Sequence, residues 1–289
     1  MVSNSPTVAR WELALRLRQR LELLGIKPPS LCKAIGFTPA YWSHVMTGRS
    51  VLTEDKLLQV MEHIDFPVDE RSEMLELRTA SKETGRWNRF SALFGDELLR
   101  LYGLEQGAHS VRGHESAVIP AMLQTPDYIR GLMTSPYGVR SAVEADHYVE
   151  ARLMRQERLT SPEPLQFTAI VTEALLTQHP WGTKIQAAQL RHIRSMVEEH
   201  PDTIDVRVAP LGSPECIALG GTVYLIDFTS GRLPTVAWYD NALFGQVDED
   251  PIRVRNLNYV YDNVFAALPS REQSLALIEA TEGRIASSA

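Results

Sequence analysis

The chain has 289 residues, of which 44% are hydrophobic and 22% charged, a composition that excludes a disordered or fibrous protein and allows two folded domains. Its net charge of −7 is unevenly distributed, because seven Lys and Arg residues stand against two Glu residues up to Thr53. That part therefore carries +5 and the remainder −12, which favours nucleic-acid binding by a basic N-terminal part, the alternative being a chance cluster on a solvated helix.

The first predicted element is an amphipathic helix at residues 10–24, which ends at Gly25, a residue suited to a helix C-terminus. Its apolar face consists of Leu13, Leu17, Leu21 and Leu24. Helices at residues 53–64 and 68–79 follow further along, each with a stripe of apolar residues.

Between these helices, residues 31–49 contain two short helical segments separated by Gly36, which permits a sharp reversal of the chain. Thr38 is predicted to cap the second segment and Pro39 to be its first residue, where the missing N–H of proline is not needed. Apolar residues of both segments fall at helical spacing on the inner side: Leu31, Cys32, Ile35, Trp42 and Val45. The residues left facing outward are Pro39, Ala40, Tyr41, Ser43, His44 and Thr47.

This pattern resembles the helix-turn-helix domain of the Xre-type regulators, the family of the phage repressors, over residues 10–80. The matching motifs here are Leu31-Cys32, Gly36-Phe37-Thr38 and Ser43-x-x-Met46-x-Gly48. The chain departs from the family at Pro28, where a phosphate-contacting glutamine is common, and at Met46, where glutamate is common. The resemblance implies that the second short helix enters the major groove of double-stranded operator DNA.

The predicted DNA contacts combine these outward residues with the nearest basic side chains, Lys33 and Arg49, which are assigned to phosphates. The full set is Lys33, Thr38, Pro39, Ala40, Tyr41, Ser43, His44, Thr47 and Arg49. Because Pro39 and Ala40 cannot form the bidentate hydrogen bonds that identify a base, direct base recognition narrows to Tyr41, Ser43 and His44.

We expect an all-α, five-helix domain over residues 1–80 and a hinge at the polar segment 81–89, which holds Gly85. Residues 90–289 are expected to form a larger α+β domain, with an antiparallel sheet flanked by helices. Predicted helices in this part lie at residues 91–101, 127–133, 142–159, 184–199, 251–267 and 270–282. Predicted strands lie at residues 166–171, 204–209, 222–228 and 235–239, the last two joined by a turn at 230–232.

Residues 86–282 resemble the C-terminal domain of actinobacterial regulators of the WhiJ-like kind, a domain without an assigned chemistry. The matching motifs are the run from Ile119 to Tyr128 (IPAMLQTPDY), the run from Val149 to Gln156 (VEARLMRQ) and the EALL run that starts at Glu173. The resemblance implies a regulator of development or antibiotic production, often encoded beside a small partner protein in an antitoxin-like pairing.

Five residues of this second domain are candidates for binding an effector: Gln124, Arg152, Arg155, Glu173 and Trp238. Each has a structural alternative. Gln124 precedes Thr125 and Pro126, which would cap and open a helix. The arginines, with Arg158, could form a solvated, salt-bridged helix face rather than an anion site. Glu173 could be a buried carboxylate paired with one of them, or it could simply be exposed. Trp238 could line an apolar pocket with Tyr224 and Trp181, or be plain core.

The sequence contains no Gly-rich phosphate loop, HExxH or GxSxG motif, so we expect no catalytic activity, metal or cofactor. His114 and Glu115 are predicted to lie on a turn. Cys32 and Cys216 form no CxxC motif, and neither a signal sequence nor an apolar run of about 18 residues is present, which predicts a cytoplasmic protein without membrane contact.

The favoured hypothesis is a dimeric, sequence-specific DNA-binding regulator whose second domain senses a small molecule or binds a small partner protein. The second hypothesis is an antitoxin-like interaction module with vestigial DNA binding. The third is an uncharacterised enzyme with a DNA-binding head.

Overall fold

The computed structural model describes residues 5–135, 142–241 and 245–287. The chain forms two compact units. The first comprises Met1–Arg89 with the short segments Tyr102–Gly107 and Ser230–Leu233, and the second contains Phe90–Leu101, Ala108–Thr229 and Pro234–Ala289. Each unit is described separately below.

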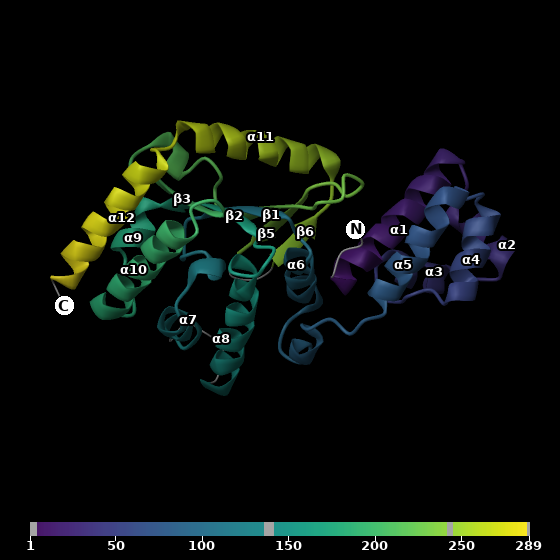
Figure 1. Cartoon of the computed structure of the whole chain (residues 1–289), viewed down its shortest axis with the longest axis horizontal. Helices are drawn as coiled ribbons and strands as arrows, with labels where there is room; N and C mark the ends of the chain where they lie inside the picture. Colours follow the sequence, from purple (N-terminus) through teal and green to yellow (C-terminus); the bar gives the residue numbers. More distant parts are fainter. Residues whose placement is uncertain (1–4, 136–141, 242–244, 288–289) are drawn as a thin grey trace. The chain divides into compact units, whose positions relative to one another are not determined.

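The first unit is built from the predicted helices (Figure 1). They are α1 (Pro6–Leu23), α2 (Pro28–Ile35), α3 (Pro39–Met46), α4 (Glu54–His63) and α5 (Arg71–Ser81), with a 3₁₀ turn, η1 (Val68–Glu70), before α5. Helix α1 begins earlier than predicted, because Ser5 caps it by accepting a hydrogen bond from the Val8 N–H at 3.5 Å.

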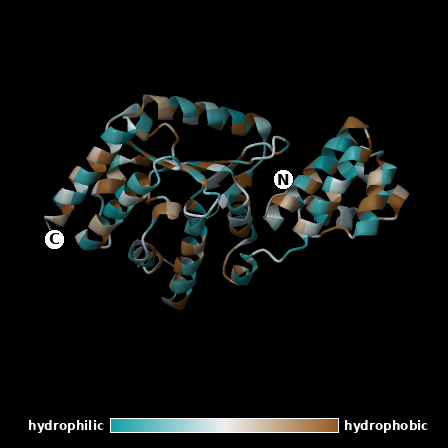
Figure 2. Ribbon diagram, in the orientation of Figure 1, coloured by the Kyte–Doolittle hydropathy of each residue, from teal (hydrophilic) through white to brown (hydrophobic). Residues whose placement is uncertain are grey.

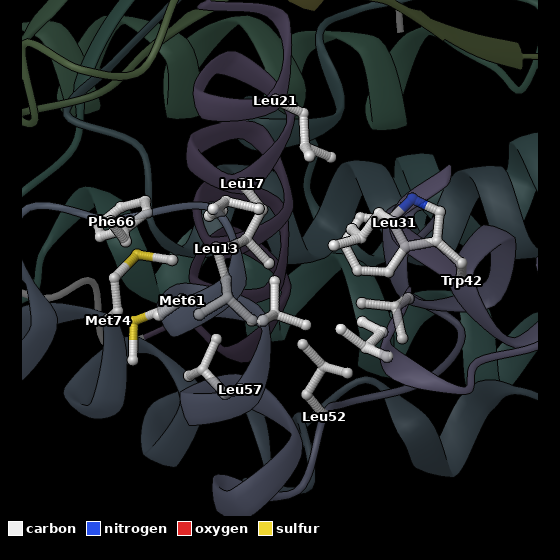
Figure 3. Close-up of a cluster of buried hydrophobic side chains, with 14 of the residues drawn as sticks. Leu13, Leu17, Leu21, Leu31, Trp42, Leu52, Leu57, Met61, Phe66 and Met74 are labelled. Atoms are coloured by element: carbon white, nitrogen blue, oxygen red, sulfur yellow. The ribbon is translucent and has the colours of Figure 1, made fainter. Parts of the chain in front are cut away.

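One hydrophobic core holds these helices together, and every helix contributes to it (Figure 3). Its central side chains are less than 5% exposed: Leu13, Leu17 and Leu21 from α1, Leu31 from α2, Trp42 from α3, Leu57 and Met61 from α4, and Met74 from α5. Burial of each contributes roughly 1.5–3 kcal/mol to stability. The prediction that Leu24 joins this face is wrong, since Leu24 lies beyond the last turn of α1 and is 42% exposed.

The second unit contains a six-stranded sheet in the order β3-β2-β1-β4-β5-β6. The strands are β1 (Ser110–Glu115), β2 (Gln166–Thr172), β3 (Ile204–Ala209), β4 (Thr222–Asp227), β5 (Val236–Asp240) and β6 (Gly245–Asp248). The α+β class is confirmed, but the sheet is mixed rather than antiparallel, since β1, β2 and β3 run parallel while β4, β5 and β6 pair antiparallel. Helices connect the parallel strands, as such crossovers require.

Helices cover both faces of this sheet. They are α7 (Pro126–Met133), α8 (Ala142–Gln156), α9 (Glu173–Thr177), α10 (Thr183–Glu199), α11 (Pro251–Ala267) and α12 (Arg271–Ala286), whereas α6 (Asp96–Gln106) is divided between the two units. Figure 1 shows α11 crossing one face, with α7, α8 and α10 on the other. Val254, Tyr261 and Val264 of α11 pack on Ile170 and Leu225 of the sheet. Figure 2 shows much of the sheet as hydrophobic, whereas α10 and α11 mix both kinds of residue.

Two of the predicted elements differ from the structure. His114 and Glu115 lie in β1, so the prediction of a turn there is wrong. The helix predicted at residues 91–101 begins only at Asp96, after Gly95. By contrast, α11 matches its predicted bounds, and α12 carries the predicted capping box between Ser270 and Gln273.

Candidate nucleic-acid interface and a buried polar cluster

The turn between α2 and α3 is set by two local devices. Gly36 has φ 73° and ψ 26°, the left-handed conformation that glycine adopts without a Cβ penalty. Thr38 then caps α3, its hydroxyl accepting from the Tyr41 N–H at 3.1 Å. These features fix the direction in which α3 leaves the turn.

Helix α3 divides into a buried and an exposed side. Trp42 and Val45 are 4% and 3% exposed and face the core. Residues at helical spacing on the opposite side are exposed: Ala40, Ser43, His44 and Thr47. Of the other predicted contacts, Tyr41 is half-buried on the flank of α3, whereas Lys33, Thr38, Pro39 and Arg49 are exposed.

The backbone of this interface offers few donors to DNA. Pro28 and Pro39 open α2 and α3 without an N–H, and Pro29 removes another from α2. The Tyr41 N–H is taken by Thr38. Phosphate binding at these helix ends is therefore weaker than free amides would allow.

Polar groups at the C-terminal end of α3 are also partly committed. The Thr47 hydroxyl donates to the Ser43 carbonyl at 2.9 Å, so in the groove it can only accept a hydrogen bond. Gly48, at φ 73°, ends the helix, and the Arg49 N–H donates to the His44 carbonyl at 2.8 Å. Arg49 thus leaves α3 in a defined direction with its side chain exposed.

Three of the basic residues counted at the N-terminus are structural. Arg10 donates to the Ser81 carbonyl at 2.7 Å, and burial lowers its pKa. Arg16 is buried and pairs with Glu70 and Glu73, and Arg20 donates to the Ile64 carbonyl at 3.1 Å. The net charge of +5 counted up to Thr53 therefore overstates the positive charge available to DNA.

One basic residue beside α3, Lys56, is not among the predicted DNA contacts. Lys56 lies in the first turn of α4, and its Nζ atom is 4.2 Å from the ring centroid of Tyr41 and 5.4 Å from that of Phe37. The two rings meet edge to face at 5.2 Å. The apolar stripe of α4 predicts its buried face, but it does not indicate that Lys56 lies beside α3.

In the second unit, two of the predicted effector residues meet. Arg152 of α8 donates to the side-chain carbonyl of Gln124. Gln124 in turn donates to the Ile119 carbonyl at 2.6 Å, while Gln156 donates to the Gln124 carbonyl at 2.8 Å. Thr125 caps α7 as predicted. The IPAMLQTPDY loop is therefore hydrogen-bonded to α8.

Glu115, at the end of β1, extends this cluster and was not predicted as a site residue. Its carboxylate accepts hydrogen bonds from the Tyr224 hydroxyl and, at 2.6 Å, from the Thr222 hydroxyl. Burial raises the pKa of Glu115 to about 7, and the nearby Arg152 acts in the opposite direction. Trp238, a third predicted residue, is paired with Tyr224 across β4 and β5.

Asp240 lies two residues beyond Trp238 at the end of β5, and a side-chain hydrogen bond from Trp238 reaches it. Asp240 is exposed, but partial desolvation at this position raises its pKa, while the charges of Arg152 and Arg155 lower it. We call the set Glu115, Gln124, Arg152, Thr222, Tyr224, Trp238 and Asp240 the sheet-face cluster.

The other predictions for this unit need correction. Arg155 is 6% exposed and Arg158 donates to the Ala108 carbonyl at 2.9 Å, so these arginines are not a solvated face. Glu173 accepts from the Leu211 N–H at 2.8 Å instead of pairing with an arginine of α8. Trp181 packs on Tyr128, at 4.6 Å between ring centroids, instead of joining Trp238.

Two family models match the chain. One, described as a helix-turn-helix domain, covers residues 12–74, and the other, described as a domain of unknown function (DUF5753), covers residues 98–280. No curated protein and no solved structure matches it. None of the described helices is long and apolar enough to cross a membrane.

Proposed function

The chain belongs to the DUF5753 family and carries a helix-turn-helix domain, and from this premise we propose that it is a sequence-specific transcription regulator acting as a homodimer. DNA binding follows from the helix-turn-helix match. The main structural support is the exposed side of α3, where Ser43 and His44 offer hydrogen-bonding groups opposite the buried Trp42. A dimer would present two such helices about 34 Å apart, one turn of DNA.

The composition of this face indicates how the regulator recognises DNA. Ala40 offers only a methyl group and Thr47 only an acceptor, so few base-specific hydrogen bonds are available. Affinity then relies on phosphate contacts and on DNA shape. Exposed Lys33 and Arg49 supply such contacts on either side of α3 in the sequence.

The same observations favour a second candidate, an antitoxin-like interaction module with weak or vestigial DNA binding. Proline at both helix starts removes amides, and the internal roles of Arg10, Arg16 and Arg20 reduce the free positive charge. The two candidates differ in one measurable respect: only the regulator discriminates its operator from other duplexes.

For the second unit we propose recognition of a small molecule or small partner protein at the sheet-face cluster, without catalytic activity. Glu115 and Gln124 are 4% and 1% exposed, and buried polar groups cost stability relative to apolar ones, so their presence beside Arg152 favours a functional role. Gln124, Arg152 and Trp238 belong to this cluster. Arg155 lies one helical turn from Arg152. The carboxylate of Glu173, by contrast, accepts a hydrogen bond from the Leu211 N–H and is not part of the cluster.

The test of DNA recognition is equilibrium binding, by fluorescence anisotropy, to the DNA upstream of the chain's own gene. We expect His44→Ala to weaken binding by about 1–3 kcal/mol and to relax preference at one base pair. His63→Ala, at an exposed histidine of α4, is the matched control. Equal affinity of the wild type for operator and random duplexes would favour the interaction module, and sedimentation analysis tests the dimer.

A further inference from the structure

We propose that Lys56 binds a DNA phosphate at the flank of α3 and that the ring of Tyr41 positions its ammonium group there. The inference rests on the proposed DNA binding and adds a contact from a helix outside the helix-turn-helix pair. It concerns the sugar-phosphate backbone and not the bases.

The ammonium group of Lys56 lies against an aromatic pair. Its Nζ atom lies 4.2 Å from the Tyr41 ring centroid and 5.4 Å from the Phe37 centroid. An ammonium group at such distances is attracted by the negative face of the ring, typically by about 0.5–1 kcal/mol at exposed sites. The edge-to-face contact between Phe37 and Tyr41 holds the two rings relative to each other.

This geometry places the charge of Lys56 at the edge of the exposed side of α3. On α3, His44 belongs to the exposed groove side and Tyr41 lies next to it around the helix, toward α4. A cation held against Tyr41 therefore lies at the border of the surface that enters the groove. The sugar-phosphate backbone forms the walls of the groove, so this border is where a phosphate is met.

The ammonium group of Lys56 remains available for a phosphate. Glu54, on the same helix, pairs with Arg78 at 3.3 Å instead. Within the described ranges, no carboxylate forms an ion pair with Lys56, which is only partly buried. A positive side chain in the first turn also opposes the helix dipole, so helix stability does not account for a lysine there.

The experiment is a salt titration of full-length protein binding to a short duplex that carries the DNA upstream of its own gene. We expect Lys56→Gln to reduce the slope of log affinity against log salt by about 0.9, the value for one phosphate contact. The affinity lost between 50 and 200 mM salt then shrinks by about threefold. Lys184→Gln, at an exposed lysine of α10, should leave the slope unchanged.

Variants of Tyr41 test the positioning role. Tyr41→Phe retains the ring and should keep the wild-type dependence of affinity on salt, even where loss of the hydroxyl, a candidate base contact, lowers the affinity itself. Tyr41→Leu should lower the slope toward that of Lys56→Gln, and the double variant should show no further decrease. If circular dichroism shows that Tyr41→Leu is unfolded, Tyr41→Met takes its place, since methionine is also non-aromatic.

The outcomes separate the two proposals. A wild-type slope in Lys56→Gln overturns the phosphate contact, and a wild-type slope in the non-aromatic Tyr41 variant overturns the positioning by the ring, in both cases with DNA binding intact. If the wild-type protein shows no salt-dependent affinity for this duplex or for a random one, the proposed DNA binding itself fails, and the contact with it.

Discussion

Replacement of Glu115 by glutamine should change how the stability of the second unit depends on pH. The carboxyl group is 4% exposed and accepts hydrogen bonds from Thr222 and Tyr224, and burial raises its pKa from 4.5 to about 7. The folded chain thus binds this proton more tightly than the unfolded chain does. Stability linked to Glu115 is full below pH 4.5 and is lost as the pH rises through about 7.

The magnitude follows from the two pKa values. Since one pKa unit corresponds to about 1.4 kcal/mol, the difference between 4.5 and about 7 corresponds to about 3 kcal/mol, most of which falls between pH 5 and pH 8. Between these pH values the wild type should lose about 2–3 kcal/mol of stability relative to Glu115→Gln. The charged and titratable groups that act on the Glu115 pKa, Arg152 and Asp240, are retained in the variant.

Native-state hydrogen exchange of the β1 and β4 amides, compared between wild type and variant at each pH, measures this difference within the second unit. Asp202→Asn, at an exposed carboxylate, is the control and should give a nearly constant difference. A constant difference in Glu115→Gln, or one of opposite sign, would refute the reasoning. In carbon NMR, Tyr224→Phe should shift the titration of Glu115 to still higher pH, because it removes a donor to the carboxylate.

Two further variants test local structure. Gly36→Ala should lower the free energy of unfolding of the first unit by about 1–2 kcal/mol, because φ is 73° and nothing lies within 4 Å of an added Cβ. Gly36→Asn should lower the free energy of unfolding by less in the same denaturant titration, because asparagine adopts the left-handed conformation more readily than alanine. Equal losses of stability in the two variants would contradict a purely conformational origin. Ser270→Ala should cost about 1 kcal/mol by removing half of the capping box, measured as faster exchange in the first turn of α12. Unchanged exchange there would show that the cap contributes nothing.

The helices were predictable because their signals are local. Thr38 and Pro39 mark the start of α3, and the spacing of Trp42 and Val45 identifies its buried side, without knowledge of any distant residue. Lys56 was not predictable in the same way. Its contact with Tyr41 depends on how α4 packs beside α3, a tertiary relationship that periodicity does not report.

The sheet was predicted in part for a related reason. Strands β2 and β3 are rich in β-branched residues, but the sequence of β1, SVRGHE, is mostly polar. Its polar side chains have partners from other elements, such as Asp227 for Arg112 and Tyr224 for Glu115. The parallel pairing was missed because it depends on the crossover between strands. Without β1, the predicted elements did not show the full alternation of strands and helices that indicates a parallel sheet.

The position of β1 at the centre of the sheet has a consequence for synthesis of the chain. Both of its neighbours, β2 and β4, come later in the sequence, β2 only from Gln166 on. At about 5–20 residues per second, the ribosome needs several seconds to produce the first partner strand. Throughout this interval β1 has two unpaired edges, the condition that favours association between nascent chains. The charges of Arg112 and Glu115 disfavour such association, so the residues that make β1 hard to recognise in the sequence also protect it before its partners exist.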